Sequence, residues 1–375
     1  MQRHLKNTRG TKQNTSTSKT VFVGLSGGVD SSVSAYLLKK AGYDVIGAFI
    51  KVWQPDVICD WKEDRRSAMR VAAHLGIPFV TIDLSKEYKK EVVDYMISEY
   101  KAGRTPNPDV MCNKEIKFKA FLNKAIEMGA DMIATGHYAQ ISCGNPTSKN
   151  CGRRVTTLLK AKDKAKEQSY FLWILTEKEL AKTFFPIGHL EKSEVRKIAE
   201  KAGLHTFEKK DSQGLCFIGK VDFKDFLKRF IKEKKGNVLN TKDEIIGHHS
   251  GATFLTIGER HGFTISKKGV NDKPFYVVSK DISKNTITVS DSSVVKNLNA
   301  KEFVLENINW ISEIPKAGRI YDAQVRYHQD YQKCKLICEG LTFTVVFENP
   351  QIAASGQSIV IYDKDVCLGG GVIKN

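Results

Sequence analysis

The chain has 375 residues, of which 41% are hydrophobic and 27% charged, a balance typical of globular proteins with two or three domains. No apolar run is long enough to span a bilayer, and the eight cysteines form no Cys-x-x-Cys pair, which argues against a membrane-spanning protein and a zinc ribbon. The formal net charge of +17 favours a polyanionic partner, with nucleic acid the first candidate. A generally basic proteome is the alternative explanation of this charge.

Residues 1–19 are polar and basic, contain no acidic side chain and are predicted to form a disordered tail. Organellar transit peptides have a similar composition, but this segment lacks a clear amphipathic face, which favours a plain extension. No secretory signal is recognisable, so we expect a reducing, cytoplasmic location.

Residues 20–36 carry the strongest motif of the chain. The apolar run Val21–Val23 predicts a buried strand, Ser26-Gly27-Gly28 predicts a tight turn, and helical spacing follows from Val29. Uncovered backbone N–H groups, serine hydroxyls and the positive end of a helix dipole then converge on one point. This arrangement predicts a phosphate-binding site.

The loop sequence SGGVDSS distinguishes between kinds of phosphate site. No lysine follows the glycines, so it is not the loop of the common NTPases, and the GxGxxG dinucleotide spacing is absent. The loop resembles that of the ATP pyrophosphatases, which split ATP into AMP and pyrophosphate, and this resemblance implies substrate adenylation. An ordinary glycine turn before a helix is the alternative.

Strands and helices alternate through the rest of the N-terminal half. This order predicts an α/β fold with a doubly wound, mostly parallel, Rossmann-like sheet that binds its ligand at the carboxyl ends of the strands. Ser26–Ser32, Ile50 and Gly136-His137 are expected there. The predicted strands are 43–53, 77–82 and 131–135, and the predicted helices are 63–76, 85–102 and about 109–128.

The second half changes character. Residues 142–157 are predicted to be an exposed insertion, and residues 166–185 and 190–202 to be helices. From about residue 236, short β-type runs separated by turns predict one or two small β domains or barrels. These runs are 253–257, 275–279, 286–289, 320–327, 333–338, 341–347 and 358–363.

The segment 103–114 contains the first cysteine of interest. Asn107 is predicted to cap a helix that has Pro108 in its first position. Cys112 then lies in the first turns, where the helix dipole and nearby lysines favour a thiolate. Asp109 shares its helix face and either accepts the thiol proton or raises the thiol pKa by repulsion. A buried structural cysteine is the alternative.

The second cysteine, Cys216, lies in the segment KKDSQGLCFIG. Its glycines and lysine pair predict a mobile, electropositive loop. Such a loop suits a cysteine that approaches a partner and withdraws, although the chemistry alone leaves this role open.

Eight motifs now combine into one pattern from Val21 to the C-terminus: SGGVDSS, GRTPNPDVMCNKEIKF, ATGHYA, EQSYFL, FPIGHLEKSEVRKIA, DSQGLCFIG, TIGERHG and CLGGGVI. Together they resemble the tRNA-specific 2-thiouridylase family, and only residues 1–19 lie outside the match. The resemblance implies an enzyme that replaces the carbon-2 oxygen of the wobble uridine (position 34) of tRNA with sulfur. ATP would adenylate that oxygen, and a cysteine persulfide would then deliver sulfur, with release of AMP and pyrophosphate.

The resemblance also implies roles for individual residues. Cys112 would be the nucleophile, Cys216 the persulfide carrier and Asp109 an acid/base. Cys112 would release sulfide from the persulfide, or the persulfide itself would attack the uridine, and both routes leave a Cys112–Cys216 disulfide. ATP-binding positions would be Gly24, Leu25, Ser26, Gly27, Gly28, Val29, Asp30, Ser31, Ile50 and Gly136. tRNA-binding positions would be Asn107, Pro108, Asp109, Lys166, Glu167, Gln168, Arg326 and Tyr327.

Partners and domains follow from the same resemblance. Mg²⁺ would accompany the ATP phosphates, with no protein-only metal site, and a cysteine desulfurase or sulfur relay protein would supply sulfur. The tRNAs would be those for Glu, Gln and Lys. The expected domains are the tail 1–19, an ATP pyrophosphatase domain 20–222, a central β-rich domain 223–297 and a tRNA-binding β-barrel 298–375.

The chain departs from the family pattern at Ile50, where the family usually has Met, at Glu167, where it usually has Asp, and over residues 54–66. In addition, Arg326 and Tyr327 follow one another in a predicted strand, so they should point to opposite faces unless a bulge intervenes.

Two other classes of function share part of the pattern. A different adenylating enzyme, such as an amidotransferase-type or argininosuccinate-like synthetase, would use the same loop without needing either cysteine. A non-catalytic RNA-binding protein with a relict nucleotide site would bind tRNA without releasing AMP.

Overall fold

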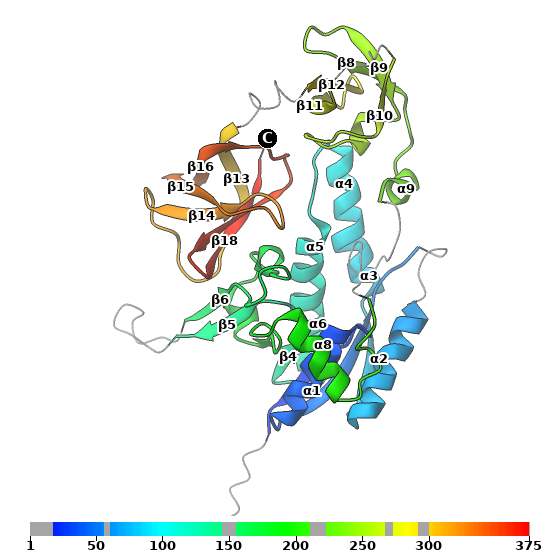
Figure 1. The fold of residues 1–375 in the computed structure, drawn as a ribbon, viewed down its shortest axis with the longest axis vertical. Coiled ribbons are helices and arrows are strands. Elements are labelled where there is room, and N and C mark those ends of the chain that lie inside the picture. The colour runs from blue at the N-terminus through cyan, green and yellow to red at the C-terminus, as the bar shows by residue number, and fades with distance from the viewer. Residues whose placement is uncertain are drawn as a thin grey trace, which may run out of the picture.

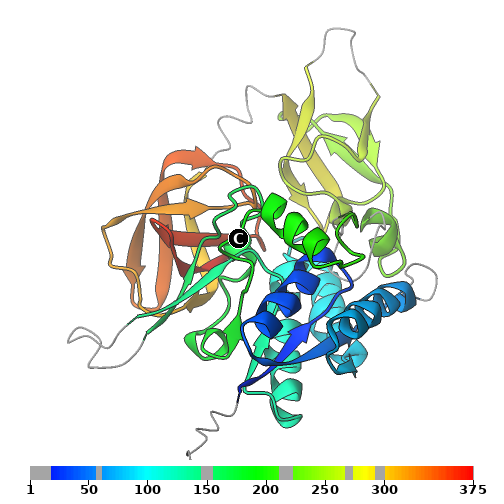
Figure 2. The same ribbon diagram turned by 60° about the horizontal axis from the view of Figure 1, so that its bottom comes forward.

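The computed structural model describes residues 18–55, 61–144, 155–210, 223–266, 273–291 and 300–374. The chain folds into an α/β domain, a small β domain and a β-barrel, which occupy the bottom, the top and the left of the view in Figure 1. Figure 2, turned toward the α/β domain, shows the barrel and the small β domain lying side by side beyond it.

The N-terminal sheet is entirely parallel, as expected for a doubly wound fold. Its strand order is β3-β2-β1-β4-β7, and the pairings β1–β2, β1–β4, β2–β3 and β4–β7 are all parallel. The strands are β1 (Thr20–Gly24), β2 (Asp44–Lys51), β3 (Phe79–Asp83), β4 (Met132–Ala134) and β7 (Thr183–Phe184). The predicted strands in this region are confirmed.

Both faces of this sheet are covered because successive side chains of a strand point to opposite sides. Phe22 packs with the helices of one face, whereas Val21 and Val23 pack with those of the other. The first face carries α3 (Ser85–Tyr88), the π-helical segment η1 (Lys89–Asp94), α4 (Tyr95–Lys101), α5 (Pro108–Met111), the π-helical segment η2 (Cys112–Ala120) and α6 (Phe121–Glu127). The second carries α1 (Val29–Lys40), α2 (Trp61–Leu75) and α8 (Lys192–Lys201). The predicted helices 63–76, 85–102, 109–128 and 190–202 are confirmed.

The predicted helix 166–185 is wrong. This stretch contains a 3₁₀ turn, η4 (Ser169–Phe171), one short helix, α7 (Glu177–Leu180), and strand β7. Tyr170 and Trp173 are buried on all sides, and the Tyr170 hydroxyl donates to carbonyl oxygens of Val325 and Ser358 in the barrel. The helical spacing of these apolar residues therefore reflects burial between two domains, and tertiary contacts decided the local structure.

The predicted insertion 142–157 is flanked by secondary structure that the sequence analysis missed. Strands β5 (Gln140–Cys143) and β6 (Thr156–Leu159) pair as an antiparallel hairpin, and residues 145–154 lie outside the described ranges. Strand β6 pairs with barrel strand β18 (Val366–Ile373). The α/β domain is thus joined to the barrel by a shared sheet.

The small β domain consists of one five-stranded sheet with the order β10-β9-β8-β12-β11, preceded by helix α9 (Phe223–Lys228). Its strands are β8 (Gly236–Leu239), β9 (Ile245–His249), β10 (Phe263–Ile265), β11 (Phe275–Asp281) and β12 (Thr286–Asp291). The predicted strand 253–257 is wrong, because the chain forms the 3₁₀ turn η5 (Ala252–Phe254) there. Leu255 nevertheless fills the small core, which explains its apolar character.

The C-terminal barrel closes because β13 pairs with both β16 and β18. Its strands are β13 (Ala300–Trp310), β14 (Ile320–Gln324), β15 (Gln332–Glu339), β16 (Thr342–Gln351), β17 (Ser358–Asp363) and β18. The predicted run 320–327 is too long: β14 ends at Gln324, and Arg326 and Tyr327 lie in the turn that follows. The expectation that these two alternate along a strand is therefore wrong.

Among the helices of the described ranges, none combines the length and the apolar character needed to cross a membrane.

Candidate active site

The glycine loop has the strand–turn–helix form that the sequence predicts. Strand β1 ends at Gly24, and helix α1 begins at Val29. Gly27 has φ +78°, a conformation that favours glycine, and a Cβ there would lie 2.5 Å from the carbonyl oxygen of Asp64. The Ser31 hydroxyl accepts from the backbone N–H of Ser26 at 3.2 Å. The loop is thus folded back on the first turn of α1, which leaves a glycine-lined cradle of the kind that holds phosphate.

The neighbouring strand ends lie against this loop. A Cβ on Gly136, which follows β4, would lie 2.7 Å from the backbone nitrogen of Ser31. A Cβ on Gly24 would lie 3.9 Å from Cδ1 of Ile50 on β2. Residues from three strand ends therefore meet at the carboxyl edge of the sheet, as the sequence predicts.

Two lysines that the sequence analysis did not assign to this loop approach it from distant segments. The Lys192 ammonium contacts both carboxylate oxygens of Asp30 at 2.8 Å. The Lys209 ammonium donates to the carbonyl oxygen of Gly27 at 3.1 Å and to Asp64 at 2.8 Å. The motifs that contain them, GHLEKSEV and EKKDSQG, were visible, but only the fold shows that they face the phosphate loop.

A serine and a histidine from outside the loop lie against it at Gly27. The Ser67 hydroxyl donates to the carbonyl oxygen of Gly27 at 2.9 Å and lies 3.0 Å from Nε2 of His205. Burial, and after it the positive charges of Arg70 and Lys209, lower the pKa of His205. A neutral imidazole is therefore favoured beside the loop at neutral pH.

The Asn107 cap is present as predicted. Its side-chain oxygen accepts from the backbone N–H groups of Asp109 at 3.2 Å and Val110 at 3.3 Å, with Pro108 in the first helical position. Cys112 opens the π-helical segment η2, a geometry that is often found at functional sites. The sequence predicts polar surroundings for the thiol. In the structure, however, the Cys112 side chain is fully buried.

The helix that carries Cys112 also contacts the nucleotide loop. A Cβ on Gly24 would lie 3.7 Å from the ring of Phe121 in α6. The Lys117 ammonium lies 3.4 Å from Nε2 of His137, the residue after Gly136. Burial, followed by the charge of Lys117, lowers the pKa of His137. Cys112 and the phosphate loop thus belong to one structural unit.

All three domains meet at the segment that leads into Asn107. The Arg104 guanidinium pairs with Glu99 of α4 at 2.7 Å and with Glu306 of the barrel. The backbone N–H of Thr105 donates to the carbonyl oxygen of Ser355 in the barrel at 2.8 Å. Its hydroxyl lies 3.2 Å from that of Thr256 in the central domain. The barrel and the central domain therefore position this segment directly.

The residues expected to bind tRNA differ in their surroundings. Glu167 is buried, its carboxylate accepts from the backbone N–H of Ser169 at 2.6 Å, and burial raises its pKa. The Gln168 side chain accepts from the backbone N–H of Tyr138 at 2.9 Å. Lys166 is half-buried. The Glu167 and Gln168 side chains therefore hold their own loop in place.

Arg326 and Tyr327, in contrast to Glu167 and Gln168, lie at the surface of the barrel. Arg326 is exposed, and Tyr327 is half-buried with its ring centroid 4.4 Å from that of Phe171 in the α/β domain. Cys216, the second predicted catalytic residue, lies outside the described residues.

The site fits ATP through its backbone. A side chain on Gly27 would clash with the backbone of Asp64 and one on Gly136 with the first turn of α1, so both glycines are needed for the shape of the loop, and the loop hydroxyls supply further donors. Within the described ranges, no group of three or more His, Cys, Asp or Glu side chains could hold a metal ion.

A parallel sheet with a glycine phosphate cradle at its carboxyl edge, joined to a closed barrel, defines a nucleotide-using α/β enzyme with an accessory β domain. Family models agree with this division. They are described as tRNA methyl transferase HUP domain for residues 19–220, tRNA methyl transferase PRC-barrel domain for 224–291 and Aminomethyltransferase beta-barrel domain for 300–373.

Full-length relatives identify the family. The chain is 46% identical to tRNA-specific 2-thiouridylase MnmA of Pseudomonas putida (strain W619) and 45% identical to that of Streptococcus uberis (strain ATCC BAA-854 / 0140J). Each match covers 94% of both chains. The chain belongs to the tRNA-specific 2-thiouridylase family, enzymes of the ATP pyrophosphatase superfamily.

Among solved structures, the U34-tRNA thiolase NcsA from Methanococcus maripaludis is 20% identical and covers 56% of this chain and 64% of that chain. Its TM-score of 0.34 is too low to add to the argument.

Proposed function

We propose that the protein catalyses ATP-dependent 2-thiolation of the wobble uridine (position 34) of tRNA, with release of AMP and pyrophosphate. One observation carries the proposal: the helix run that contains Cys112 packs through Phe121 and Lys117 against the strand ends that form the phosphate cradle. Activation by ATP and attack by sulfur are thereby available at one place.

In the first step, the carbon-2 oxygen of the uridine attacks the α-phosphorus of ATP, and pyrophosphate leaves. An amide-like oxygen is a poor leaving group, and adenylation converts it into part of AMP, which is a good one. Backbone N–H groups of Ser26–Ser31 and the N-terminus of α1 would hold the departing pyrophosphate. Lys192 and Lys209 would supply the positive charge that a P-loop lysine gives elsewhere, and Mg²⁺ would neutralise further phosphate charge.

In the second step, sulfur replaces the adenylated oxygen at carbon 2. The terminal sulfur of a Cys216 persulfide attacks carbon 2, and the Cys112 thiolate then attacks Cys216 Sγ, which breaks the S–S bond and leaves the sulfur on the uridine. In the alternative route, the Cys112 thiolate first attacks Cys216 Sγ and expels sulfide, which attacks carbon 2. AMP leaves, and Cys112 and Cys216 end as a disulfide that an external thiol reductant must reduce. Asp109, three residues before Cys112, would act as acid/base, and the cap Asn107-Pro108 would contact the flipped base.

The division of labour follows the domains. We assign catalysis to residues 20–222, a linking role to 223–297 and tRNA binding to the barrel 298–375. Arg326 and Tyr327 would contact the RNA through their side chains, whereas Lys166–Gln168 would act through the loop that they hold. A cysteine desulfurase or sulfur relay protein would supply sulfur, and tRNAs for Glu, Gln and Lys would be the substrates.

The test is to measure 2-thiouridine by mass spectrometry in tRNA from a strain that lacks its own enzyme and expresses wild type or a cysteine variant. Wild type should restore thiolation, and Cys112→Ala and Cys216→Ala should abolish it. Cys338→Ala is the matched control, because that exposed thiol lies on barrel strand β15, in the domain that lacks the phosphate cradle.

The possible outcomes separate the parts of the proposal. Thiolation by Cys216→Ala would remove that residue from the mechanism but leave the reaction standing. Absence of thiolation with soluble wild type and a compatible sulfur donor would refute the function. AMP release with no thiolated product would then point to another adenylating enzyme.

A further inference from the structure

The TIGERHG motif, residues 256–262, lies between η5 and β10 in the central domain. The side chain of its glutamate, Glu259, is only 23% exposed. One carboxylate oxygen accepts from the Lys224 ammonium of α9 at 2.6 Å, and the other accepts from the backbone N–H of Thr256 at 3.0 Å. Glu259 therefore joins α9 to the start of its own motif.

The contact with Thr256 leads to the segment that precedes the Cys112 helix. The Thr256 hydroxyl lies 3.2 Å from the hydroxyl of Thr105. Thr105 is followed in the chain by Asn107, which caps the helix run that contains Cys112. The turn that Glu259 holds is thus in contact with the entry to this helix.

The contact with Lys224 leads to the other cysteine segment. Helix α9, which carries Lys224, is the first described element after Cys216 in the chain. Its Phe226 side chain is fully buried in the same apolar cluster as Cys112. The core therefore holds α9 through its apolar side chains, and Glu259 holds it through the charge of Lys224.

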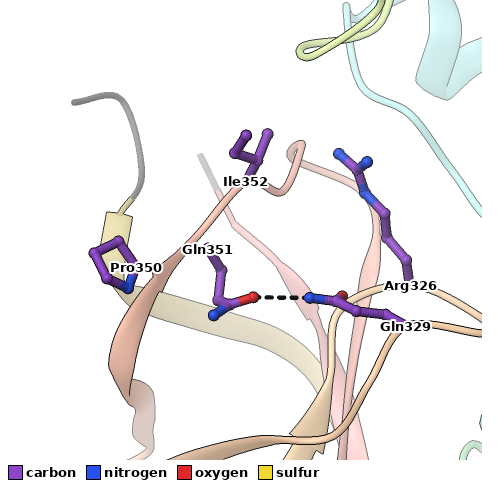
Figure 3. Close-up of a pocket in the computed structure, with 5 residues that line it drawn as sticks. All are labelled: Arg326, Gln329, Pro350, Gln351 and Ile352. Carbon is purple, nitrogen blue, oxygen red and sulfur yellow. Dashed lines mark hydrogen bonds between the residues drawn. The ribbon is translucent and has the colours of Figure 1, made fainter. Parts of the chain in front are cut away.

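The motif also lies against the barrel. A Cβ on Gly258, which has φ +85°, would lie 3.3 Å from Cγ2 of Ile352 and 3.5 Å from Nη2 of Arg326. Figure 3 shows these two barrel side chains at the edge of a cavity of about 380 Å³. Glycine permits both the backbone conformation and the close approach. The turn that carries Glu259 is thus in contact with the barrel as well as with the α/β domain.

These contacts bear on sulfur transfer because they anchor the segments of both cysteines. A thiol on a tethered segment meets its partner at an effective concentration that depends on where the tether is anchored. Thr105 comes shortly before Cys112 in the chain, and Lys224 comes shortly after Cys216. One carboxylate therefore joins an anchor of each segment.

We propose that Glu259 is a positioning residue for the reaction between the two cysteines. Its carboxylate holds α9 and the Thr256 turn together, and thereby raises the effective concentration of Cys216 at Cys112. Glu259 acts through these two segments and not by contact with ATP or the uridine. The inference rests on the proposed function, because that function assigns the chemistry of the two cysteines.

The test measures the Cys112–Cys216 disulfide in a glutathione buffer. Oxidised glutathione converts the two thiols into the disulfide and leaves as two reduced molecules, so the equilibrium constant is itself an effective concentration. The cross-linked peptide is quantified by mass spectrometry after acid quenching. Glu259→Ala should lower the equilibrium constant ~5-fold, and Lys224→Met should lower it by a similar factor, as expected for the loss of a partly exposed ion pair.

The matched control is Lys228→Met, because Lys228 lies on the same helix but pairs with Asp225 and Glu233. It should leave the equilibrium constant unchanged. The double variant of Glu259→Ala and Lys224→Met should lose no more than Glu259→Ala alone, because both changes remove the same contact.

Pyrophosphate release separates positioning from general damage to the fold. Adenylation does not use the cysteines, so Glu259→Ala should release pyrophosphate in the first turnover at the wild-type rate. A parallel fall in pyrophosphate release and in the equilibrium constant would overturn the positioning role.

An unchanged equilibrium constant in Glu259→Ala, or an equal fall in Lys228→Met, would also overturn it. So would the absence of a Cys112–Cys216 disulfide in wild type that still thiolates tRNA. Absence of 2-thiouridine with soluble wild type and a compatible sulfur donor would instead refute the proposed function. If Glu259→Ala fails to fold, Lys224→Met decides the question, because that side chain is more exposed, at 35%.

Discussion

The phosphate loop and the turn after β14 are built from different parts of the chain. The loop Ser26–Ser31 presents backbone groups from one continuous segment, and its shape depends on glycines. The turn at Arg326–Gln329 presents side chains, and its neighbours come from the α/β domain, the central domain and a second barrel strand. A phosphate is the same in every nucleotide, so backbone N–H groups suffice, whereas a base must be distinguished by side-chain chemistry.

The largest effect should come from breaking the backbone site. In Gly136→Ala, the new Cβ would stand 2.7 Å from the nitrogen of Ser31, so the first turn of α1 must shift. We expect tRNA-dependent AMP release to fall ~100-fold, because displacements of this size cost catalysis heavily. Binding of tRNA should change little, since the barrel is untouched.

The matched control is Gly144→Ala, where the nearest atom to the new Cβ is 3.5 Å away. It should retain AMP release. If Gly136→Ala lost as much tRNA affinity as AMP release, the separation of the phosphate site from the tRNA-binding barrel would be contradicted.

The ion pairs of Arg104, which join the α/β domain to the barrel, should give the next largest effect. Arg104 is 16% exposed and stands between Glu99 and Glu306, so Arg104→Ala leaves two carboxylates partly buried and unpaired. We expect a loss of about 2 kcal/mol in the free energy of unfolding. Urea denaturation measures it.

Arg319→Ala provides the comparison, because its pair with Asp363 is half-exposed and such pairs contribute only about 0–1 kcal/mol. Equal losses in the two variants would show that the Arg104 pairs do not tie the domains together.

The smallest effect should appear at Glu167. Burial raises its pKa, so the folded state favours the protonated carboxyl. Its contribution to stability is complete below the ordinary glutamate pKa and is lost as the pH rises through the raised value. Glu167→Gln should therefore reduce the loss of stability between about pH 4.5 and neutrality, measured as melting temperature against pH. Glu200→Gln, at an exposed position, should follow wild type, and an unchanged profile for Glu167→Gln would refute the assignment.

Local signals explain which parts of the site were predictable. The glycine loop, the Asn107 cap and the alternating elements of the sheet each depend on residues close in sequence, and each is confirmed. The wrong helix prediction for 166–185 shows a signal that is not local. The apolar pattern of this stretch comes from Tyr170 and Trp173, which are buried where the barrel packs against the α/β domain. Arg326 and Tyr327 were placed in a strand, since nothing local marks the end of β14.

The sequence by itself determined the phosphate loop, the capped entry to the Cys112 helix and the family, because backbone conformation and capping depend on neighbouring residues. Only the tertiary structure decided that Cys112 is fully enclosed, that Lys192 and Lys209 reach the loop, and that three domains meet at Arg104 and Thr105. These contacts join residues that are far apart in the sequence, such as Arg104 and Glu306, which are 202 positions apart. Such pairs become neighbours only through the packing of whole domains, which no local pattern records.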